Sequence, residues 1–448
     1  MTGKPPRILL ESTCSFDTRF TTGIQRVVRS VVAEAQAIGE QLDLECVPVV
    51  FRNDRFYDAR HAWRRRTVQS RDGAQSLRQR LACEIERLSP RASQLAAAAR
   101  IRARKLFYPK TLARRLTNTR WQLGARPITL GPSDILLLLD ETWRLPIWST
   151  LDEARDRGCR VGSVIYDLIP IDHPQFFQTE FVSLFTEGLQ TQVNHSDFFL
   201  PISEAVADRL RAHLPHVPPV AEHSEKPVAA FQLGAATANA PVRGAVRSRV
   251  QQLFGPESQT TPFLCVGTLE PRKNHLYLLD AFEAVWQQDP SIPLCIVGRV
   301  GWKCQQTVER IHNHPRFGTS LFLFTDLSDA ELFTCYRRAQ ALITCSVDEG
   351  YGLPVVEGLR HGLTVLASDI PVHREVGRQA CRYVDLADPR SLARCVLDVQ
   401  RSDEASPPQA TERFETTSWR ESTRDLLLKA LDMGGNRSGH TPNRHAAA

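Results

Sequence analysis

The sequence lacks any apolar run long enough to cross a membrane, and its cysteines form no metal or redox motif. A membrane-spanning helix needs about 20 consecutive apolar residues, and no run of about 18 occurs in the chain. The 11 cysteines are an odd number, and no two have the C-x-x-C spacing of zinc or redox sites. We therefore expect buried, reduced thiols and no transmembrane helix.

The start of the sequence also lacks the apolar segment of a signal peptide. Residues 1–7 (MTGKPPR) are polar or basic, and only the short apolar run 8–10 follows them. Together with reduced thiols, this predicts a cytosolic location.

One segment carries all of the basic excess. The formal net charge is +6, yet residues 60–126 alone hold 18 Lys and Arg against three acidic residues, so the remainder is net acidic. Apolar residues at intervals of three or four predict an arginine-rich helical insertion. It is either a solvated cover of the domain edge or a contact for anionic lipid at the inner face of the cytoplasmic membrane. Nucleic acid is disfavoured, because aromatic residues for base stacking are few.

Strand and helix patterns alternate in both halves of the chain. An apolar strand near residues 8–11, a glycine turn, an amphipathic helix from residue 23 and a strand at 45–51 are typical of a doubly wound parallel sheet. Because one core rarely exceeds about 250–300 residues, we expect two such Rossmann-like domains facing across a cleft. The candidate strands of the second domain are 263–266, 294–297, 321–324, 341–344, 364–367 and 382–384.

Composition sets the expected domain limits. We place a first domain at 1–233, a linker rich in Gly, Ala, Asn and Pro at 234–258, a second domain at 259–411, and a disordered tail at 434–448.

Residues 348–362 (DEGYGLPVVEGLRHG) place a glycine-rich loop between a strand and a helix. Pro354 suits the first helical position, and Gly362 suits the helix end. The open N–H groups of such a helix start attract anions and sugar hydroxyls. Two carboxylates, Glu349 and Glu357, stand at either end of this turn.

A second stretch, residues 266–275 (VGTLEPRKNH), also lies between a strand and a helix. Its pair Arg272 and Lys273 can supply the positive charge that a leaving diphosphate requires, although a solvated basic dipeptide is the plainer interpretation of the pair alone. No Asp-x-Asp motif stands at a strand end. We therefore expect the two cations to replace a divalent metal, and we expect no cofactor.

In combination, these stretches resemble the retaining glycosyltransferases of family 4, which have the two-domain GT-B fold. The resemblance covers the second domain almost whole. In the first domain it rests on two short stretches that are similar to bacterial mannosyltransferases building surface polysaccharides such as O-antigen. The matching residues are 267–274, 324–332, 349–358 and 367–376 in the second domain, and 22–27 and 166–174 in the first.

The resemblance implies a role for each matching residue. Glu349 would lie near the hydroxyls of the donor sugar, Glu357 would bind the nucleotide ribose, and Arg272 and Lys273 would hold the diphosphate. A closing helix at 412–433 would cross back and pack on the first domain. The assigned residues are Glu349, Lys273 and Arg272 as catalytic, Gly23, Gly267, Thr268, Gly350, Tyr351, Gly352, Leu353 and Glu357 as donor-binding, and Tyr166 and Asp167 as acceptor-side.

Two positions depart from the family's pattern. Many relatives carry an arginine where this chain has Thr268, which leaves more of the charge to Arg272 and Lys273. Many also carry a histidine where this chain has Tyr166, so the residue that contacts the reacting centre stays open. The alternative for Tyr166 and Asp167 is that they merely end a strand.

The expected activity is transfer of a hexose with retention of configuration. Mannose from GDP-mannose is the first choice of donor, a UDP-sugar is the second, and the acceptor is a saccharide or a polyprenyl-diphosphate-linked glycan. Two alternatives stay open: a nucleotide-sugar epimerase on the same fold, and a non-catalytic basic protein that holds membrane or nucleic acid through residues 60–126. Incubating a nucleotide sugar without acceptor distinguishes an epimerase from a transferase. Deleting the basic segment should abolish the function of a non-catalytic basic protein but leave soluble-acceptor transfer by a glycosyltransferase intact.

Overall fold

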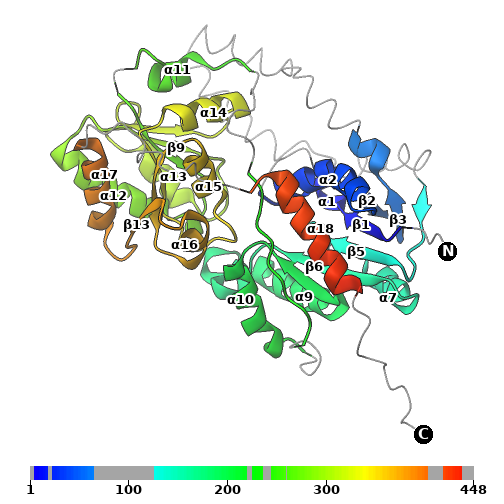
Figure 1. Cartoon of the computed structure of the whole chain (residues 1–448). Helices are drawn as coiled ribbons and strands as arrows, with labels where there is room; N and C mark the ends of the chain where they lie inside the picture. Colours follow the sequence, from blue (N-terminus) through cyan, green and yellow to red (C-terminus); the bar gives the residue numbers. More distant parts are fainter. Residues whose placement is uncertain are drawn as a thin grey trace, which may run out of the picture.

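The computed structural model describes residues 5–18, 23–64, 126–218, 225–235, 244–258, 260–401 and 417–435. They form two α/β domains that face each other (Figure 1). Most of the predicted basic insertion, and the predicted tail beyond residue 435, lie outside the described residues.

The first domain is built on a seven-stranded sheet of order β4-β3-β2-β1-β5-β6-β7. Five strands are parallel, as predicted, but β3 and β4 add an antiparallel edge that the sequence patterns did not predict. Because β3 is joined to β2 by a tight turn at Asn53 and Asp54, both at positive φ, it can only return antiparallel. The strands are β1 (Arg7–Glu11), β2 (Glu45–Arg52), β3 (Arg55–Asp58), β4 (Pro127–Ile128), β5 (Asp134–Leu138), β6 (Arg160–Ile165) and β7 (Phe198–Pro201).

Helices cover both faces of this sheet. On one face, α2 buries Val27, Val31, Ala35 and Ile38, which recur at helical spacing, against alternate residues of β1 and β5. On the other face lies α7. The helices are α1 (Thr13–Asp17), α2 (Gly23–Gln41), η1 (Thr142–Arg144), α7 (Trp148–Asp156), α8 (Ile169–Asp172), η2 (Pro174–Phe176), α9 (Thr179–His195), α10 (Glu204–His213) and η3 (Leu214–His216).

The second domain has a six-stranded, wholly parallel sheet of order β10-β9-β8-β11-β12-β13. The six predicted strands are confirmed, each within one residue. They are β8 (Phe263–Val266), β9 (Leu294–Val297), β10 (Leu321–Phe324), β11 (Ala341–Thr344), β12 (Thr364–Ser368) and β13 (Cys381–Val384).

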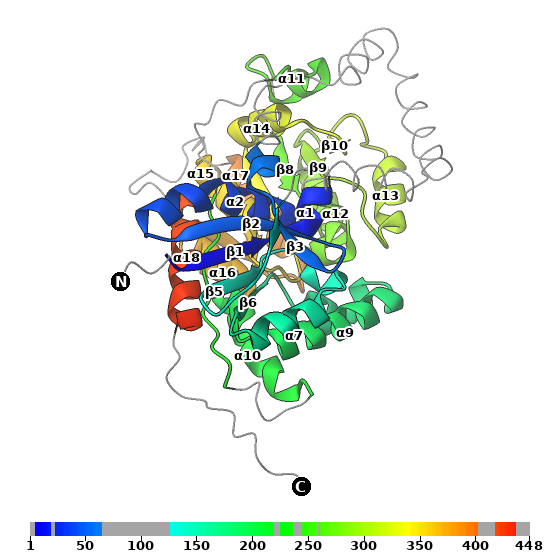
Figure 2. The same ribbon diagram turned by 90° about the vertical axis from the view of Figure 1, so that its right-hand side faces the viewer.

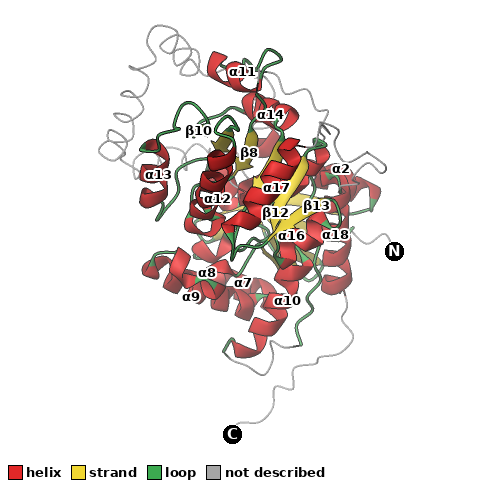
Figure 3. Ribbon diagram, turned by 90° about the vertical axis from the view of Figure 1, so that its left-hand side faces the viewer, coloured by secondary structure: helices red, strands yellow, loops and turns green. Residues whose placement is uncertain are grey.

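The helices of the second domain divide between the two faces of its sheet. On one face, α12 and α17 lie side by side (Figure 3) and pack with α13 over one set of alternate strand residues. On the other face lie α14 and α15. The helices are η5 (Pro271–Lys273), α12 (His275–Gln288), α13 (Gln305–His312), α14 (Asp329–Arg338), α15 (Leu353–Arg360), α16 (Pro371–Gly377) and α17 (Pro389–Arg401).

The C-terminal part of the predicted linker, 234–258, belongs to the second domain in the structure. Helix α11 (Ser248–Phe254) buries Val250, Leu253 and Phe254 in the core of the second domain. Their spacing of three and four residues gives the helix one apolar face, which the Gly- and Pro-rich composition nearby obscured. The second domain therefore includes α11.

The last described helix, α18 (Trp419–Gly435), lies against α2 of the first domain (Figures 1 and 2). Leu426, Leu427 and Ala430 are fully buried in the core that α2 and β1 share. The chain thus enters the second domain near Ala235 and leaves it near Ser418, and these two residues form a parallel bridge.

Among the described residues, no helix is both long and apolar enough to cross a bilayer. Every cysteine in the described part of the chain is a free thiol, and most of these are buried.

Candidate active site

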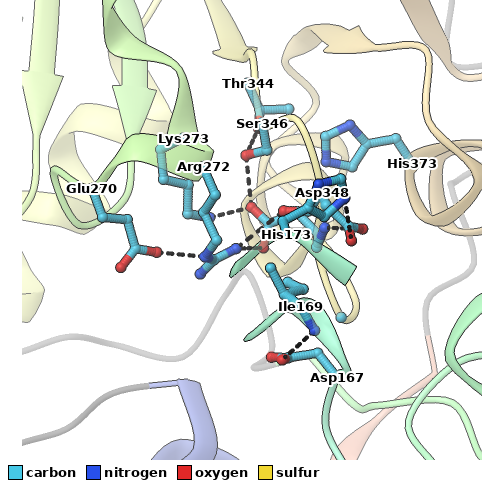
Figure 4. A network of polar contacts seen from close by, with 12 residues as sticks. Asp167, Ile169, His173, Glu270, Arg272, Lys273, Thr344, Ser346, Asp348 and His373 are labelled. Atoms are coloured by element: carbon cyan, nitrogen blue, oxygen red, sulfur yellow. Dashed lines mark hydrogen bonds and ion pairs between the residues drawn. The ribbon is translucent and has the colours of Figure 1, made fainter. Parts of the chain in front are cut away.

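The carboxyl ends of β8 and β11 bring the two predicted motifs together. The 3-10 turn η5 after β8 carries Arg272 and Lys273, and the loop after β11 carries Glu349. Arg272 Nη1 lies 2.6 Å from Glu349 Oε2, and Lys273 Nζ forms an ion pair with Glu349 Oε1. Figure 4 shows Arg272 and Lys273 directed toward the loop that carries Ser346 and Asp348.

This ion cluster is almost wholly enclosed by protein. The Glu349 side chain is 8% exposed, and Ser346 Oγ donates a hydrogen bond to it over 2.7 Å. Burial alone would raise the pKa of Glu349, but the charges of Arg272 and Lys273 outweigh it and hold the pKa well below its usual range. Arg272 Nε also lies 2.6 Å from Glu270, so two carboxylates share two cations.

The second predicted glutamate, Glu357 on α15, joins the two domains. Its Oε2 accepts a hydrogen bond from the Tyr336 hydroxyl over 2.6 Å, and its Oε1 forms an ion pair with Arg26 of α2. The sequence analysis did not assign Arg26 or Tyr336. Arg26 lies within the matching stretch 22–27, so that stretch was the available signal.

The glycine loop between these glutamates contacts the first domain closely. A Cβ on Gly350 would lie 2.2 Å from the carbonyl oxygen of Tyr166, so only glycine fits there. Gly352, the N-cap residue before α15, has a φ of +85°, which again favours glycine. Ser203 Oγ, at the start of α10, donates to the Gly350 carbonyl over 2.8 Å. The two domains therefore meet along this loop.

Two residues predicted to bind the donor have side chains directed elsewhere. Tyr351 is buried in the first domain's core, where its hydroxyl donates to the carbonyl of Leu233 over 2.8 Å, and Leu353 packs against that core. At these positions only the backbone can serve a ligand beside Glu349. The Tyr351 side chain is an anchor between the domains.

The remaining glycines predicted for the donor lie at the mouths of the two sheets. Gly267 and Thr268 follow β8, and a Cβ on Gly267 would touch the Lys273 side chain at 3.4 Å. Gly23 begins α2, and a Cβ there would have no neighbour within 4 Å among the described residues.

The first domain holds the loop before Glu349 through Arg209 and His173, which the sequence analysis did not assign. Arg209 of α10 pairs with Asp348 and donates to the Glu349 carbonyl over 3.1 Å. His173 Nε2 lies 3.4 Å from the same Asp348 carboxylate. His173 falls inside the matching stretch 166–174, whereas nothing in the sequence marked Arg209.

His373 is a further unassigned residue beside this loop. It is fully buried, its Nδ1 lies 3.0 Å from the Ser368 carbonyl, and its Nε2 has no hydrogen-bond partner among the described residues. Burial lowers its pKa, so the ring is neutral at ordinary pH.

The predicted acceptor-side pair lines a cavity of about 190 Å³ between the domains. Tyr166 donates its hydroxyl to the Leu139 carbonyl over 2.7 Å, and Asp167 accepts from the Ile169 amide over 3.2 Å. Burial raises the pKa of Asp167, while Arg272 opposes that rise from the second domain. The structure thus brings the acceptor-side pair and Arg272 to one cavity.

Behind this cavity, Glu11 and Asp140 form a buried pair of carboxyl groups at the ends of β1 and β5. The Thr13 amide and the Thr142 hydroxyl donate to Glu11 over 2.7 and 2.6 Å, and Asp140 lines the cavity itself. Burial, and then the charge of Asp140, raise the pKa of Glu11 from 4.5 to about 7.

Glu11 is expected to make stability fall as pH rises from about 4.5 to about 7. In this window the folded protein keeps a proton that the unfolded chain has released, so the stabilisation present below 4.5 is lost, by about 3 kcal/mol in all. Glu11→Gln should flatten the slope in urea titrations across this range, and Glu153→Gln on the exposed side of α7 is the control. An unchanged slope in Glu11→Gln would contradict the assignment.

Sequence comparison identifies related proteins for most of the chain. Residues 251–403 match the family model described as Glycosyl transferases group 1. The chain is 31% identical over 317 residues to the serotype-specific mannosyltransferase WbdA of Escherichia coli, a match covering 68% of this chain and 38% of WbdA. It is 29% identical over 155 residues to the O-antigen chain mannosyltransferase RfbU of Salmonella typhimurium, covering 34% of this chain and 40% of RfbU. The match therefore spans little more than a third of WbdA.

Solved structures show the same arrangement of two domains. A glycosyltransferase of Rickettsia africae superposes with a TM-score of 0.56 at 12% identity, over 97% of this chain and all of that one. HepE of Anabaena, solved with UDP and glucose, gives a TM-score of 0.55 at 12% identity, over 95% of this chain and 99% of that one. At such identities the likeness establishes the fold. The chain therefore carries a domain of the group 1 glycosyltransferase family within a two-domain GT-B fold.

Proposed function

We propose that this protein is a retaining glycosyltransferase that transfers a hexose, with mannose as the first choice, from a nucleotide-diphosphate sugar to a glycan acceptor in surface polysaccharide synthesis. The family of residues 251–403 and the names of the relatives support this proposal. The observation that carries it is the cluster of Arg272, Lys273 and Glu349 beside a cavity that both domains line.

Arg272 and Lys273 are the proposed binding groups for the diphosphate. Both cations form ion pairs with Glu349, and Arg272 also pairs with Glu270, so a diphosphate must compete with the Glu349 carboxylate for them. The displaced carboxylate is then available to accept hydrogen bonds from the hydroxyls of the sugar. When the diphosphate replaces Glu349 as the partner of the two cations, Arg272 and Lys273 would hold the diphosphate and Glu349 would hold the sugar.

The proposed reaction is a front-face displacement. The acceptor oxygen forms a bond to the anomeric carbon on the side from which the diphosphate leaves, the bond from that carbon to the phosphate oxygen breaks, and the acceptor proton passes to the leaving phosphate. Positioning and stabilisation of the leaving charge supply the catalysis. Because two cations serve the diphosphate, activity is expected to persist in EDTA, and loss on chelation with recovery in Mn²⁺ would refute this point.

Glu357 is the proposed ribose ligand. Its carboxylate can accept two neighbouring hydroxyls, and Tyr336 and Arg26 already orient it. Since Arg26 comes from the first domain, a nucleotide bound here would touch residues held by both domains.

The proposal is tested by binding first and by transfer second. A thermal-shift screen of GDP-, UDP- and ADP-sugars should select one nucleotide, because ligand at 100 times its Kd adds about 2.7 kcal/mol to stability. The selected sugar is then incubated with and without a mannoside acceptor, and the anomeric configuration of the product is read by NMR. Conversion of the sugar without acceptor would favour an epimerase, and no shift with any nucleotide sugar would contradict the proposal. Soluble-acceptor transfer should survive deletion of residues 65–125, the greater part of the basic segment 60–126, whose contact with an anionic membrane stays a prediction.

A further inference from the structure

A loop of the second domain reaches across to the first domain at the mouth of the cavity. It joins β9 to α13 and carries Trp302 and Lys303 at its tip. Trp302 Nε1 donates to the Phe176 carbonyl over 2.9 Å, and Lys303 Nζ donates to the Gln175 carbonyl over 3.0 Å. The second domain therefore holds η2, the turn that precedes the cavity-lining Phe177.

The Trp302 ring continues a row of aromatic rings that begins in the first domain. It stacks on Phe177 with centroids 5.6 Å apart and planes at 28°, and Phe177 stacks on Phe181 at 5.5 Å and 22°. Phe185 extends the row along α9, and Trp143 meets it edge-on at 5.4 Å. All five rings line the same cavity.

Charged groups also line this cavity. Asp140, Glu141 and Asp167 come from the ends of the first sheet's strands, Arg272 comes from the second domain, and Arg144 lies over the Trp143 ring at 4.7 Å. A pyranose ring presents an apolar C–H face and a rim of hydroxyls, which this combination of aromatic faces and a few polar groups suits. One of these charged groups is Arg272, where the donor diphosphate is proposed to lie.

Trp302 is not explained as a core residue. It is 37% exposed, one of few large apolar side chains so exposed in the described chain. Its ring is fixed by the hydrogen bond to Phe176 and by stacking on Phe177, and it lines the cavity while part of it remains open to solvent, so a ligand in the cavity can contact it.

We propose that Trp302 is a specificity-determining residue for the acceptor, whose terminal sugar ring binds in the cavity against the row that Trp302 forms with the aromatic rings of the first domain. This inference rests on the proposed glycosyltransferase function and names a substrate contact within it. Because Trp302 belongs to the donor-binding domain, the acceptor subsite is complete only when the domains are closed. The Glu357–Arg26 pair also spans the domains, so a bound nucleotide and the acceptor should favour the same closed state.

The test is calorimetric titration of the full chain with α-mannobiose and octyl α-mannoside, with and without saturating GDP. The wild-type protein should bind one or both acceptors about tenfold more tightly when GDP is present. Trp302→Ala should weaken acceptor binding about tenfold or more and abolish the effect of GDP, while Trp302→Phe should restore most of both. Val300→Ala changes a 53% exposed side chain of the same loop that does not line the cavity, and should behave as wild type.

GDP affinity and melting temperature, measured for every variant, keep the outcomes apart. Wild-type acceptor affinity in Trp302→Ala, or no acceptor binding by the GDP-bound wild type, would overturn the inference. If GDP does not bind the wild type, the titrations use the nucleoside diphosphate that the thermal-shift screen selects. If no nucleotide binds, the proposed function fails, and the inference is judged on the titration without nucleotide. Trp302→Ala must then still weaken acceptor binding relative to wild type and Val300→Ala, and equal affinities would overturn it.

Discussion

Lys273→Ala is expected to lower kcat/KM for the nucleotide sugar by about a hundredfold to a thousandfold. Removing one electrostatic donor to a developing oxyanion costs about 3–4 kcal/mol in enclosed sites, and the Lys273 side chain, 12% exposed, is mostly enclosed beside Glu349. The loss should appear in both donor affinity and turnover, because the ammonium would contact the diphosphate before and during departure.

Two control variants show whether the loss in Lys273→Ala comes from this charge at this position. Lys273→Arg keeps the charge and should recover part of the activity, although a guanidinium differs in shape from an ammonium. Arg374→Ala removes a cation on the exposed side of the same domain, where it pairs with Asp369, and should be neutral. Initial rates over a range of donor concentrations give kcat and KM separately. Parent-like kinetics in Lys273→Ala would exclude this residue from the diphosphate site.

Glu349→Gln is expected to separate binding from turnover. The amide retains the shape of the carboxylate but releases Lys273 from its ion pair with Glu349 and leaves Arg272 paired with Glu270 alone, so GDP should bind as tightly as before or more tightly. Turnover should fall about a hundredfold, because the group proposed to orient the sugar hydroxyls loses its charge. Opposite changes in affinity and rate are the signature to look for.

For Glu349→Gln, calorimetry gives the affinity for GDP and steady-state rates give the turnover. Tyr351→Phe in the same loop is the matched control: it removes the hydrogen bond to Leu233 and about 1 kcal/mol of stability, but should leave GDP affinity unchanged. The double variant Lys273→Ala/Glu349→Gln should lose less than the two single effects added together, since both groups act in one cluster. Glu349→Gln with the parent turnover would show that the sugar is held elsewhere.

The sequence predicted those parts of the molecule that depend on neighbouring residues. Strands of the second sheet were visible as short apolar runs, and the helix start at Gly352 was visible from the glycines and Pro354. The resemblance assigned Arg272, Lys273 and Glu349 to one donor site, whereas the ion pairs among them were not predicted.

Contacts between distant segments were beyond such reasoning. The pair of Glu357 with Arg26 joins residues more than 300 positions apart, and no local pattern indicates it. Tyr351 sits in a motif typical of ligand contact, yet its ring packs in the other domain's core. The aromatic row takes its rings from η1, from Phe177 just after η2, from α9 and from the loop after β9. Each segment contributes only one or two rings, so no segment alone indicates the row.

The return of α18 to the first domain has a consequence for how the chain folds during synthesis. Leu426 and Leu427 fill the core around β1 and α2, which are made at the very beginning of translation. This core cannot close until residues near 430 have left the ribosome, by which time all strands of the second domain have already been made. Domains usually fold in the order of their synthesis. Here the second domain can complete its fold first, while part of the apolar face of the first domain's sheet remains uncovered until α18 is made.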